Sequence, residues 1–204
     1  MDDKILLSTA YLPPLSYFML IDGAGEIFIE KEENYPRQTY RNRCKILSSN
    51  GPLVLSVPVK KGGVPKAKIK DVEIDYTKRW QNIHLRALTA SYNSAPWFQF
   101  YFEKIERIIN SGPKLLIDLN TDLLYTMLEY LKIKKNIGFT YVFEPAADAD
   151  NDYRYRLSPK NESSFETREY TQVFNYRTGF MPGLSIIDLL FNMGPESAEY
   201  LHAE

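Results

Sequence analysis

The sequence is poor in the residues that build most catalytic and metal sites. It contains one cysteine, Cys44, and two histidines, His84 and His202, in 204 residues. A single thiol excludes an intramolecular disulfide and any zinc site with several thiolate ligands. The chain also lacks a Walker loop, a GxGxxG turn, a GxSxG elbow and an HExxH pair. No standard catalytic motif therefore assigns it to an enzyme class.

Long apolar runs are missing as well. The N-terminus begins with an acidic pair, and Pro13 and Pro14 interrupt its apolar stretch. Neither a signal peptide nor a membrane span fits that pattern, so we expect a cytoplasmic protein. An apolar fraction of 44% and a charged fraction of 25% are those of a soluble globular protein. The length favours one domain over residues 1–204.

Acidic residues are absent from one long stretch. Between Glu33 and Asp71 the chain carries nine cations and no anion: Arg37, Arg41, Arg43, Lys45, Lys60, Lys61, Lys66, Lys68 and Lys70. A nucleic-acid-binding protein would show a high overall pI, whereas the value here is about 6.2. The pattern therefore predicts a local anion site in this basic segment and no nucleic-acid partner.

The most specific part of the basic segment follows Tyr40. If the chain is extended there, Arg41, Arg43 and Lys45 share one side and Asn42 lies on the other. Guanidinium groups match phosphate and carboxylate geometry bidentately, so these residues are candidate ligand contacts. The alternative is a solvated edge strand whose charges prevent aggregation.

The first thirty residues have the pattern of a βαβ unit. Apolar runs near Ile5 and Ile27 predict two strands. Between them, Pro13 and Pro14 suit a helix entrance and Gly23 suits its exit. This unit resembles the start of a Rossmann-like nucleotidyltransferase domain, an analogy of fold only.

Further strands are expected near Leu55, Ile74, Ile117 and Val142. We expect all six strands in one mixed sheet, with flanking helices that include one beginning at Trp80. The fold class is therefore α/β. Residues 145–169 are polar and lack periodicity, which predicts a long surface loop. Residues 183–204 are expected to close the fold as a helical segment.

Candidate chemistry falls at three other places. His84 is either a half-buried neighbour of Trp80 or a general acid or base. Asp118 and Asn120 are expected where a strand ends and a helix begins, the usual ligand position in open α/β sheets, although Asn120 also suits a helix cap. The acidic cluster Glu30, Glu32 and Glu33 could hold a metal or act as a base, but most such clusters are solvated; we assign no metal site.

Six blocks of the chain carry a resemblance to a known family. They are, in order, AYLPPLSYF, ENYPRQTYRNRCKI, NGPLVLSVPV, IKDVEIDYTKRWQNIHLRALTASYNSAPWFQFY, LIDLN and SIIDLLFNMGPES. Together they resemble the WbqC-like protein family across nearly the whole chain. One departure lies at Leu7, Ser8 and Thr9, where many members carry a His-Gln-Pro run. A mechanism that needs that histidine would lack it in this protein.

The resemblance implies a role in the synthesis of O-antigen or other bacterial surface polysaccharides, with transfer of a glycyl or sugar-modifying group. It assigns no residue a role. We expect a transferase that binds a phosphorylated or nucleotide-linked small molecule. The expected contacts are the anion with Arg41, Arg43 and Lys45, a ring with Tyr11 and Trp80 beside Pro13, and a proton moved by His84. The alternative is a non-catalytic scaffold that docks an acidic partner. The sequence names no cofactor and no oligomeric state.

Overall fold

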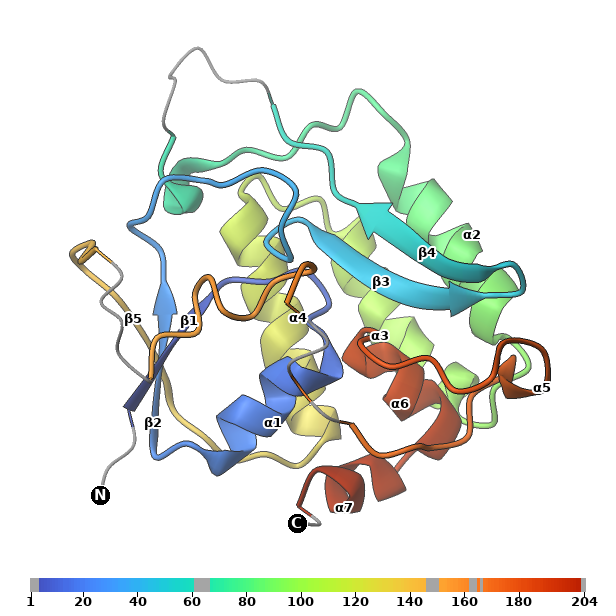
Figure 1. Ribbon diagram of the computed structural model, residues 1–204. Helices are drawn as coiled ribbons and strands as arrows, with labels where there is room; N and C mark the ends of the chain where they lie inside the picture. Colours follow the sequence, from blue (N-terminus) through green and yellow to red (C-terminus); the bar gives the residue numbers. More distant parts are fainter. Residues whose placement is uncertain (1–3, 61–66, 146–150, 162–164, 166, 203–204) are drawn as a thin grey trace.

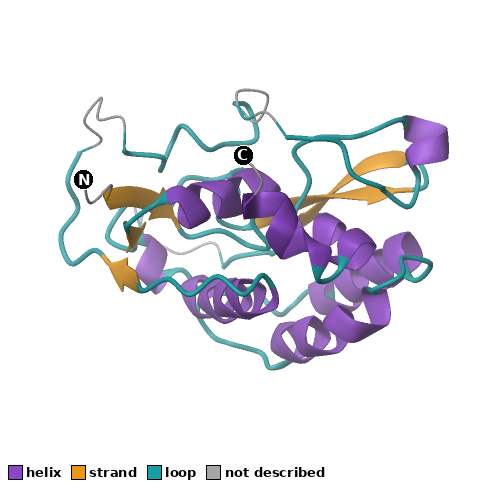
Figure 2. Cartoon of the chain, turned by 90° about the horizontal axis from the view of Figure 1, so that it is seen from below, coloured by secondary structure: helices purple, strands orange, loops and turns teal. Residues whose placement is uncertain are grey.

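The chain forms an α/β structure with two separate sheets and helices packed against them (Figure 1). It is a computed structural model that describes residues 4–60, 67–145, 151–161, 165 and 167–202. The two groups of strands lie apart, and Figure 2 shows helices filling the space between and beside them. The predicted α/β class is confirmed.

The first sheet is built on the predicted βαβ unit. Strand β1 (Lys4–Ser8) leads through helix α1 (Leu15–Gly23) to strand β2 (Glu26–Glu30), and the two strands pair in parallel. A third parallel strand, β5 (Ile137–Phe139), joins the other edge of β2. Alternate apolar side chains of β1 and β2 are buried, as a sheet packed on a helix requires. The carboxyl ends of all three strands therefore point to one edge.

The second sheet is a two-stranded hairpin. Strands β3 (Arg43–Ser48) and β4 (Gly51–Ser56) pair antiparallel through a tight turn. Gly51 has a φ of 100°, a conformation that suits glycine best. Pro58, which cannot donate to a ladder, lies beyond the end of β4.

The prediction of one mixed sheet is wrong. Leu55 belongs to the separate hairpin, and Ile74 forms only an isolated bridge with Val59 after a short 3₁₀ turn (Ile69–Asp71). Ile117 lies inside helix α4 (Leu116–Tyr130), and Val142 lies beyond β5. The LLIDLN run was ambiguous because a short apolar run fits a buried helix as well as a strand. Its apolar positions continue at helical spacing to Leu128, and this longer pattern is that of a helix.

The predicted helix at Trp80 and the predicted helical segment at the end of the chain are both present. The helix predicted at Trp80 is α2 (Trp80–Tyr92), and it is followed by α3 (Phe98–Asn110). Three helices end the chain: α5 (Asn175–Thr178), α6 (Ile186–Met193) and α7 (Glu196–His202). Buried side chains from both sheets and from α1, α2, α3, α4, α6 and α7 form one hydrophobic cluster.

A buried carboxylate, Asp188, ties the hairpin to the C-terminal helices. It accepts hydrogen bonds from the Tyr92 and Tyr170 hydroxyls, both at 2.8 Å, and from Gln172 at 3.1 Å. The Tyr92 hydroxyl in turn accepts the Leu47 amide of β3 at 3.1 Å. Burial away from water raises the pKa of Asp188 to about 6, against the lowering effect of these donors.

Candidate functional site

The first turn of the chain presents Tyr11 to helix α2. The turn holds Leu12 at a φ of 41°, a strained conformation for a leucine. Ser185 donates to the Leu12 carbonyl at 2.8 Å and stabilises the turn from the far end of the sequence. The Tyr11 hydroxyl is hydrogen-bonded to His84 Nδ1 at 2.9 Å, across 73 residues of sequence. Two residues of the predicted site are thus in direct contact.

His84 is buried beside Trp80. It is 2% exposed, and its ring lies edge-on to the Trp80 ring at 5.1 Å between centroids. Burial lowers the pKa of His84 to about 4, although a hydrogen bond with the Ser56 backbone acts in the opposite direction. The imidazole is therefore neutral near pH 7. It can accept a proton but cannot provide a positive charge for an anion.

Two asparagines continue this network toward the first sheet. Asn120 donates through Nδ2 to the Arg41 carbonyl at 2.8 Å and to Thr9 Oγ1 at 3.1 Å. Asn42 donates through Nδ2 to the Val57 carbonyl at 2.9 Å. Val57 follows Ser56, whose backbone is hydrogen-bonded to His84. Thr9 lies two residues before Tyr11, which is bonded to His84 from the other side. The two asparagines are therefore linked to the same histidine. We call Thr9, Tyr11, Asn42, Trp80, His84 and Asn120, together with Arg43, which follows Asn42 in the chain, the polar layer.

Several groups in the polar layer lack a hydrogen-bond partner. In the described part of the chain, five buried side-chain atoms are unpaired, and four of them belong to this layer: Asn42 Oδ1, Arg43 Nε, Trp80 Nε1 and Asn120 Oδ1. The amide orientations are set by the donor bonds of Asn42 and Asn120, so their free atoms are acceptors. Unpaired buried groups are few in native proteins, and each calls for a partner.

A second polar group, the edge cluster, consists of Glu30, Glu33, Arg41, Asp152 and Arg154. It lies at the carboxyl end of β2. Arg41 binds Glu33 through Nε at 2.6 Å and Nη2 at 2.8 Å. Arg154 binds Glu30 at 2.9 Å and Asp152 at 2.6 Å. Glu30 and Glu33 are 0% exposed, and both arginines are 2% exposed.

Glu30, at the end of β2, connects the end of β5 with the segment beside β1. Its Oε1 accepts the Glu32 amide at 2.6 Å and the hydroxyl of Thr140, just after β5, at 2.7 Å. Its Oε2 binds Arg154, which comes from the segment that pairs with β1. The interpretation of this acidic cluster as solvated is wrong for Glu30 and Glu33, because the fold supplies an arginine for each.

The basic segment does have acidic partners in the folded chain. Glu33 neutralises Arg41, and Glu32 binds both Lys68 at 2.7 Å and Lys70 at 2.8 Å. Lys60 binds Glu73 at 2.7 Å. The reasoning that no acid is available was wrong, because acids on either side of the gap fold back onto it. Lys61 and Lys66 lie outside the described residues.

After Arg41 is assigned to Glu33, Arg43 and Lys45 are the two residues of the predicted anion site that could still bind an anion. Both are half-buried, and no ion pair involving either is found among the described residues. Arg43 lies near Tyr35, whose pKa burial raises to about 12 while Arg43, Arg37 and Arg41 oppose the rise. Of the three predicted anion contacts, all within the described residues, Arg43 and Lys45 therefore have no ion pair, whereas Arg41 has one.

Of the other residues predicted to contact a ligand, most are buried and one, Asp118, is exposed. The Tyr40 carbonyl accepts the Tyr11 amide at 2.9 Å, and the buried Pro13 carbonyl accepts the Ile186 amide at 2.9 Å. Tyr11 and Trp80 face each other edge-on at 6.5 Å and are buried, so neither ring is open to a ligand in this conformation. Asp118 is exposed and is not brought into the polar layer with Asn120.

Sequence reasoning missed Asp152, Arg154 and Tyr155. They lie in the stretch predicted as a long polar loop, yet Arg154 is fully buried and the Tyr155 hydroxyl donates to Glu33 at 3.1 Å. The only signal in the sequence is the alternation of charged and aromatic residues in DYRYR.

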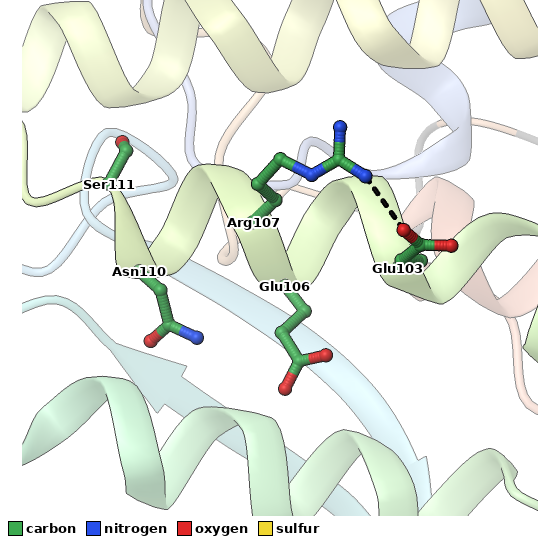
Figure 3. Close-up of a pocket in the computed structure, with 5 residues that line it drawn as sticks. All are labelled: Glu103, Glu106, Arg107, Asn110 and Ser111. Carbon is green, nitrogen blue, oxygen red and sulfur yellow. Dashed lines mark hydrogen bonds and ion pairs between the residues drawn. The ribbon is translucent and has the colours of Figure 1, made fainter.

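Other features of the surface carry less chemistry. Within the described ranges, no three His, Cys, Asp or Glu side chains are grouped to hold a metal. An open depression on α3 is lined by Glu103, Glu106, Arg107, Asn110 and Ser111 (Figure 3). Its one ion pair, Arg107 with Glu103 at 2.7 Å, is exposed. No described helix is long and apolar enough to cross a membrane.

Comparison with known proteins places the chain in a family. It is 29% identical over 223 residues to the uncharacterized protein Rv1507c of Mycobacterium tuberculosis (strain ATCC 25618 / H37Rv), and the alignment covers 96% of each chain. No solved structure matches it. The model of the WbqC-like protein family matches residues 9–160 and 161–200. This match confirms the resemblance found in the sequence, and the chain belongs to the WbqC-like protein family.

Proposed function

We propose that the protein is a transferase of bacterial surface-polysaccharide synthesis that binds a phosphorylated or nucleotide-linked donor at the polar layer. The observation that carries the proposal is that four of the five unpaired buried side-chain atoms in the described part of the chain belong to residues of the polar layer. A buried donor or acceptor without a partner costs about 1–3 kcal/mol. A ligand that supplies the partners recovers that free energy, so such groups favour binding.

The chemistry of the unpaired groups suits a polar donor molecule. Arg43 Nε and Trp80 Nε1 are donors, and they match the oxygens of a phosphate or carboxylate. Asn42 Oδ1 and Asn120 Oδ1 are acceptors, and they match hydroxyl or amino groups. A phosphorylated sugar or an activated acyl compound carries both kinds of group. Lys45 would add charge beside Arg43.

His84 is the proposed proton-transfer group. Its lowered pKa of about 4 keeps the imidazole neutral near pH 7, and its bond to Tyr11 fixes the ring. Because Nδ1 is bonded to the Tyr11 hydroxyl, the proton of an attacking hydroxyl or amine would pass to the Tyr11 oxygen while Tyr11 gives its own proton to Nδ1. Because His84 is 2% exposed, the substrate must enter the layer before this step.

Thermal unfolding in the presence of nucleotide sugars, aminoacyl donors and simple phosphates tests the proposal. A ligand that binds only the folded chain at 100 times its Kd adds about 2.7 kcal/mol to the free energy of unfolding. Arg43→Gln should weaken binding of the stabilising compound at least about tenfold, since a charge-assisted hydrogen bond is worth about 1.5–3 kcal/mol.

The matched control is Arg86→Gln, which removes an exposed arginine of α2. It should leave the affinity unchanged. Equal losses for Arg43→Gln and Arg86→Gln would contradict a specific site. Small, equal losses at Arg43, Lys45 and Lys68, together with a uniform salt dependence, would instead support the scaffold that docks an acidic partner. The pairing of Lys68 and Lys70 with Glu32 weighs against that alternative.

A further inference from the structure

One segment, residues 151–157, runs along the free edge of the parallel sheet, and we call it the strap. The Leu6 amide donates to the Asn151 carbonyl at 2.9 Å, and the Tyr153 amide donates to the Leu6 carbonyl at 2.9 Å. Asp152 and Leu6 form a parallel bridge. In Figure 1 this orange segment lies beside β1. Leu157, 5% exposed, anchors its end in the core.

The strap supplies Asp152 and Arg154 to the edge cluster, and polar contacts hold it over the other three members, Glu30, Glu33 and Arg41. Arg154 reaches across to Glu30 and to the Glu144 carbonyl, both at 2.9 Å. The Tyr155 hydroxyl binds Glu33, and the Arg154 carbonyl accepts Arg41 Nη2 at 3.3 Å. Tyr155 itself is 45% exposed, whereas the charged groups beneath it are almost fully buried.

The ion pairs of the strap add little net free energy to its closed position. Burying a carboxylate and a guanidinium costs hydration, and their pairing returns little more than that cost. If the strap lifted, Glu30 and Arg154 would regain water as they lost each other. The backbone adds only two hydrogen bonds to β1, each worth about 0.5–1.5 kcal/mol net.

We infer that the strap is a latched cover that opens locally, without unfolding of the rest of the chain, and exposes Glu30, Glu33 and Arg41 at the carboxyl edge of the sheet. That edge is where open α/β sheets bind ligands. Arg41 connects it to the polar layer, because its carbonyl accepts Asn120 while its guanidinium binds Glu33. Opening of the strap is thus a route from solvent toward the polar layer. The inference concerns the strap alone and holds whether or not the proposed donor is correct.

Hydrogen exchange of two amides measures the opening directly. The Leu6 and Tyr153 amides are bonded across the strap boundary, whereas the Thr140 amide, bonded to the Ile29 carbonyl at 3.1 Å, reports on the sheet itself. In the unaltered protein, Leu6 and Tyr153 should exchange at least about tenfold faster than core amides that exchange only on global unfolding. Tyr155→Phe, which removes the bond to Glu33, should speed them further and leave Thr140 unchanged.

A second variant guards against a simple folding defect. Arg154→Gln alone leaves Glu30 and Asp152 without their cation, so the triple variant Glu30→Gln, Asp152→Asn and Arg154→Gln removes all three charges. It should speed exchange at Leu6 and Tyr153 at least tenfold, whereas Arg107→Gln on exposed α3 should not. If both amides exchange at the rate of global unfolding in all these proteins, the strap is an integral edge of the sheet and the inference is wrong.

Discussion

The edge cluster and the polar layer lie next to each other but differ in how completely their polar groups are paired. Arg41 and Arg43 are two residues apart, yet Arg41 makes two bonds to a buried carboxylate and Arg43 retains an unpaired Nε. Paired charges hold elements together and are neutral toward a ligand. Unpaired groups leave free energy that a ligand can recover. The comparison gives Arg41 a structural role and leaves Arg43 as the arginine that we propose binds the donor.

The largest effect should come from breaking the paired arginine. Arg41→Ala leaves Glu33 buried without a cation, and we expect a loss of about 3–5 kcal/mol in the free energy of unfolding. Arg43→Ala has no ion pair to break and should cost less than about 1 kcal/mol. Urea unfolding of both variants measures the difference. Similar losses for the two would remove the distinction between cluster and layer.

The second prediction uses pH, because the polar layer contains a buried histidine, His84, and the core contains a buried carboxylate, Asp188. The pKa of His84 is lowered from 6.5 to about 4, so the unfolded chain binds more protons in that range. Its contribution to stability falls as the pH drops from 6.5 to 4. The pKa of Asp188 is raised from 3.8 to about 6, so the folded chain binds more protons there. Its contribution falls as the pH rises from 3.8 to 6.

These two contributions oppose each other, each by about 3 kcal/mol at about 1.36 kcal/mol per pKa unit. Asp188→Asn should therefore expose the His84 effect, and the variant should lose stability relative to the unaltered protein as the pH falls from 6 to 4. His84→Gln should shift the profile in the opposite direction. Denaturant unfolding at several pH values gives the curves. Parallel curves for Asp188→Asn and the unaltered protein would show that Asp188 does not titrate as the burial implies.

The smallest effect should come from an exposed pair with the same chemistry as the edge cluster. Arg107 and Glu103 lie one turn apart on α3, with side chains 72% and 78% exposed. Water and salt screen such a pair, so Arg107→Gln should change the free energy of unfolding by only about 0.3–0.5 kcal/mol. A loss comparable to that of Arg41→Ala would mean that burial does not decide the strength of these ion pairs.

Local pattern was sufficient for the βαβ unit, the strand at Leu55 and the helix at Trp80. Their signals lie within short windows: prolines before a helix, alternation in a strand, and apolar spacing in α2. The same reasoning failed at Ile117, because the apolar run that begins there is compatible with either element. It also failed for the sheet, since the pairing of distant strands depends on packing that no short window contains.

For the candidate site, the sequence indicated which residues would be involved, but it did not indicate which residues would pair with one another. The sequence singled out Tyr11, Asn42, Trp80, His84 and Asn120, and the structure places them in one buried layer. It also singled out Arg41 for an anion, whereas the fold gives that guanidinium to Glu33. Arg154 was missed because its partner Glu30 is 124 residues away in sequence.

The sequence by itself determined which segments are helical or extended at the N-terminus and in α2, where cations are concentrated, and that the blocks match one family. Those properties depend on side-chain type and local spacing. Only the tertiary structure decided which charges are neutralised, which polar atoms remain unpaired and which loop covers the sheet edge. These depend on contacts between residues far apart in the chain, and Coulomb and hydrogen-bond energies act only over the short distances that folding creates.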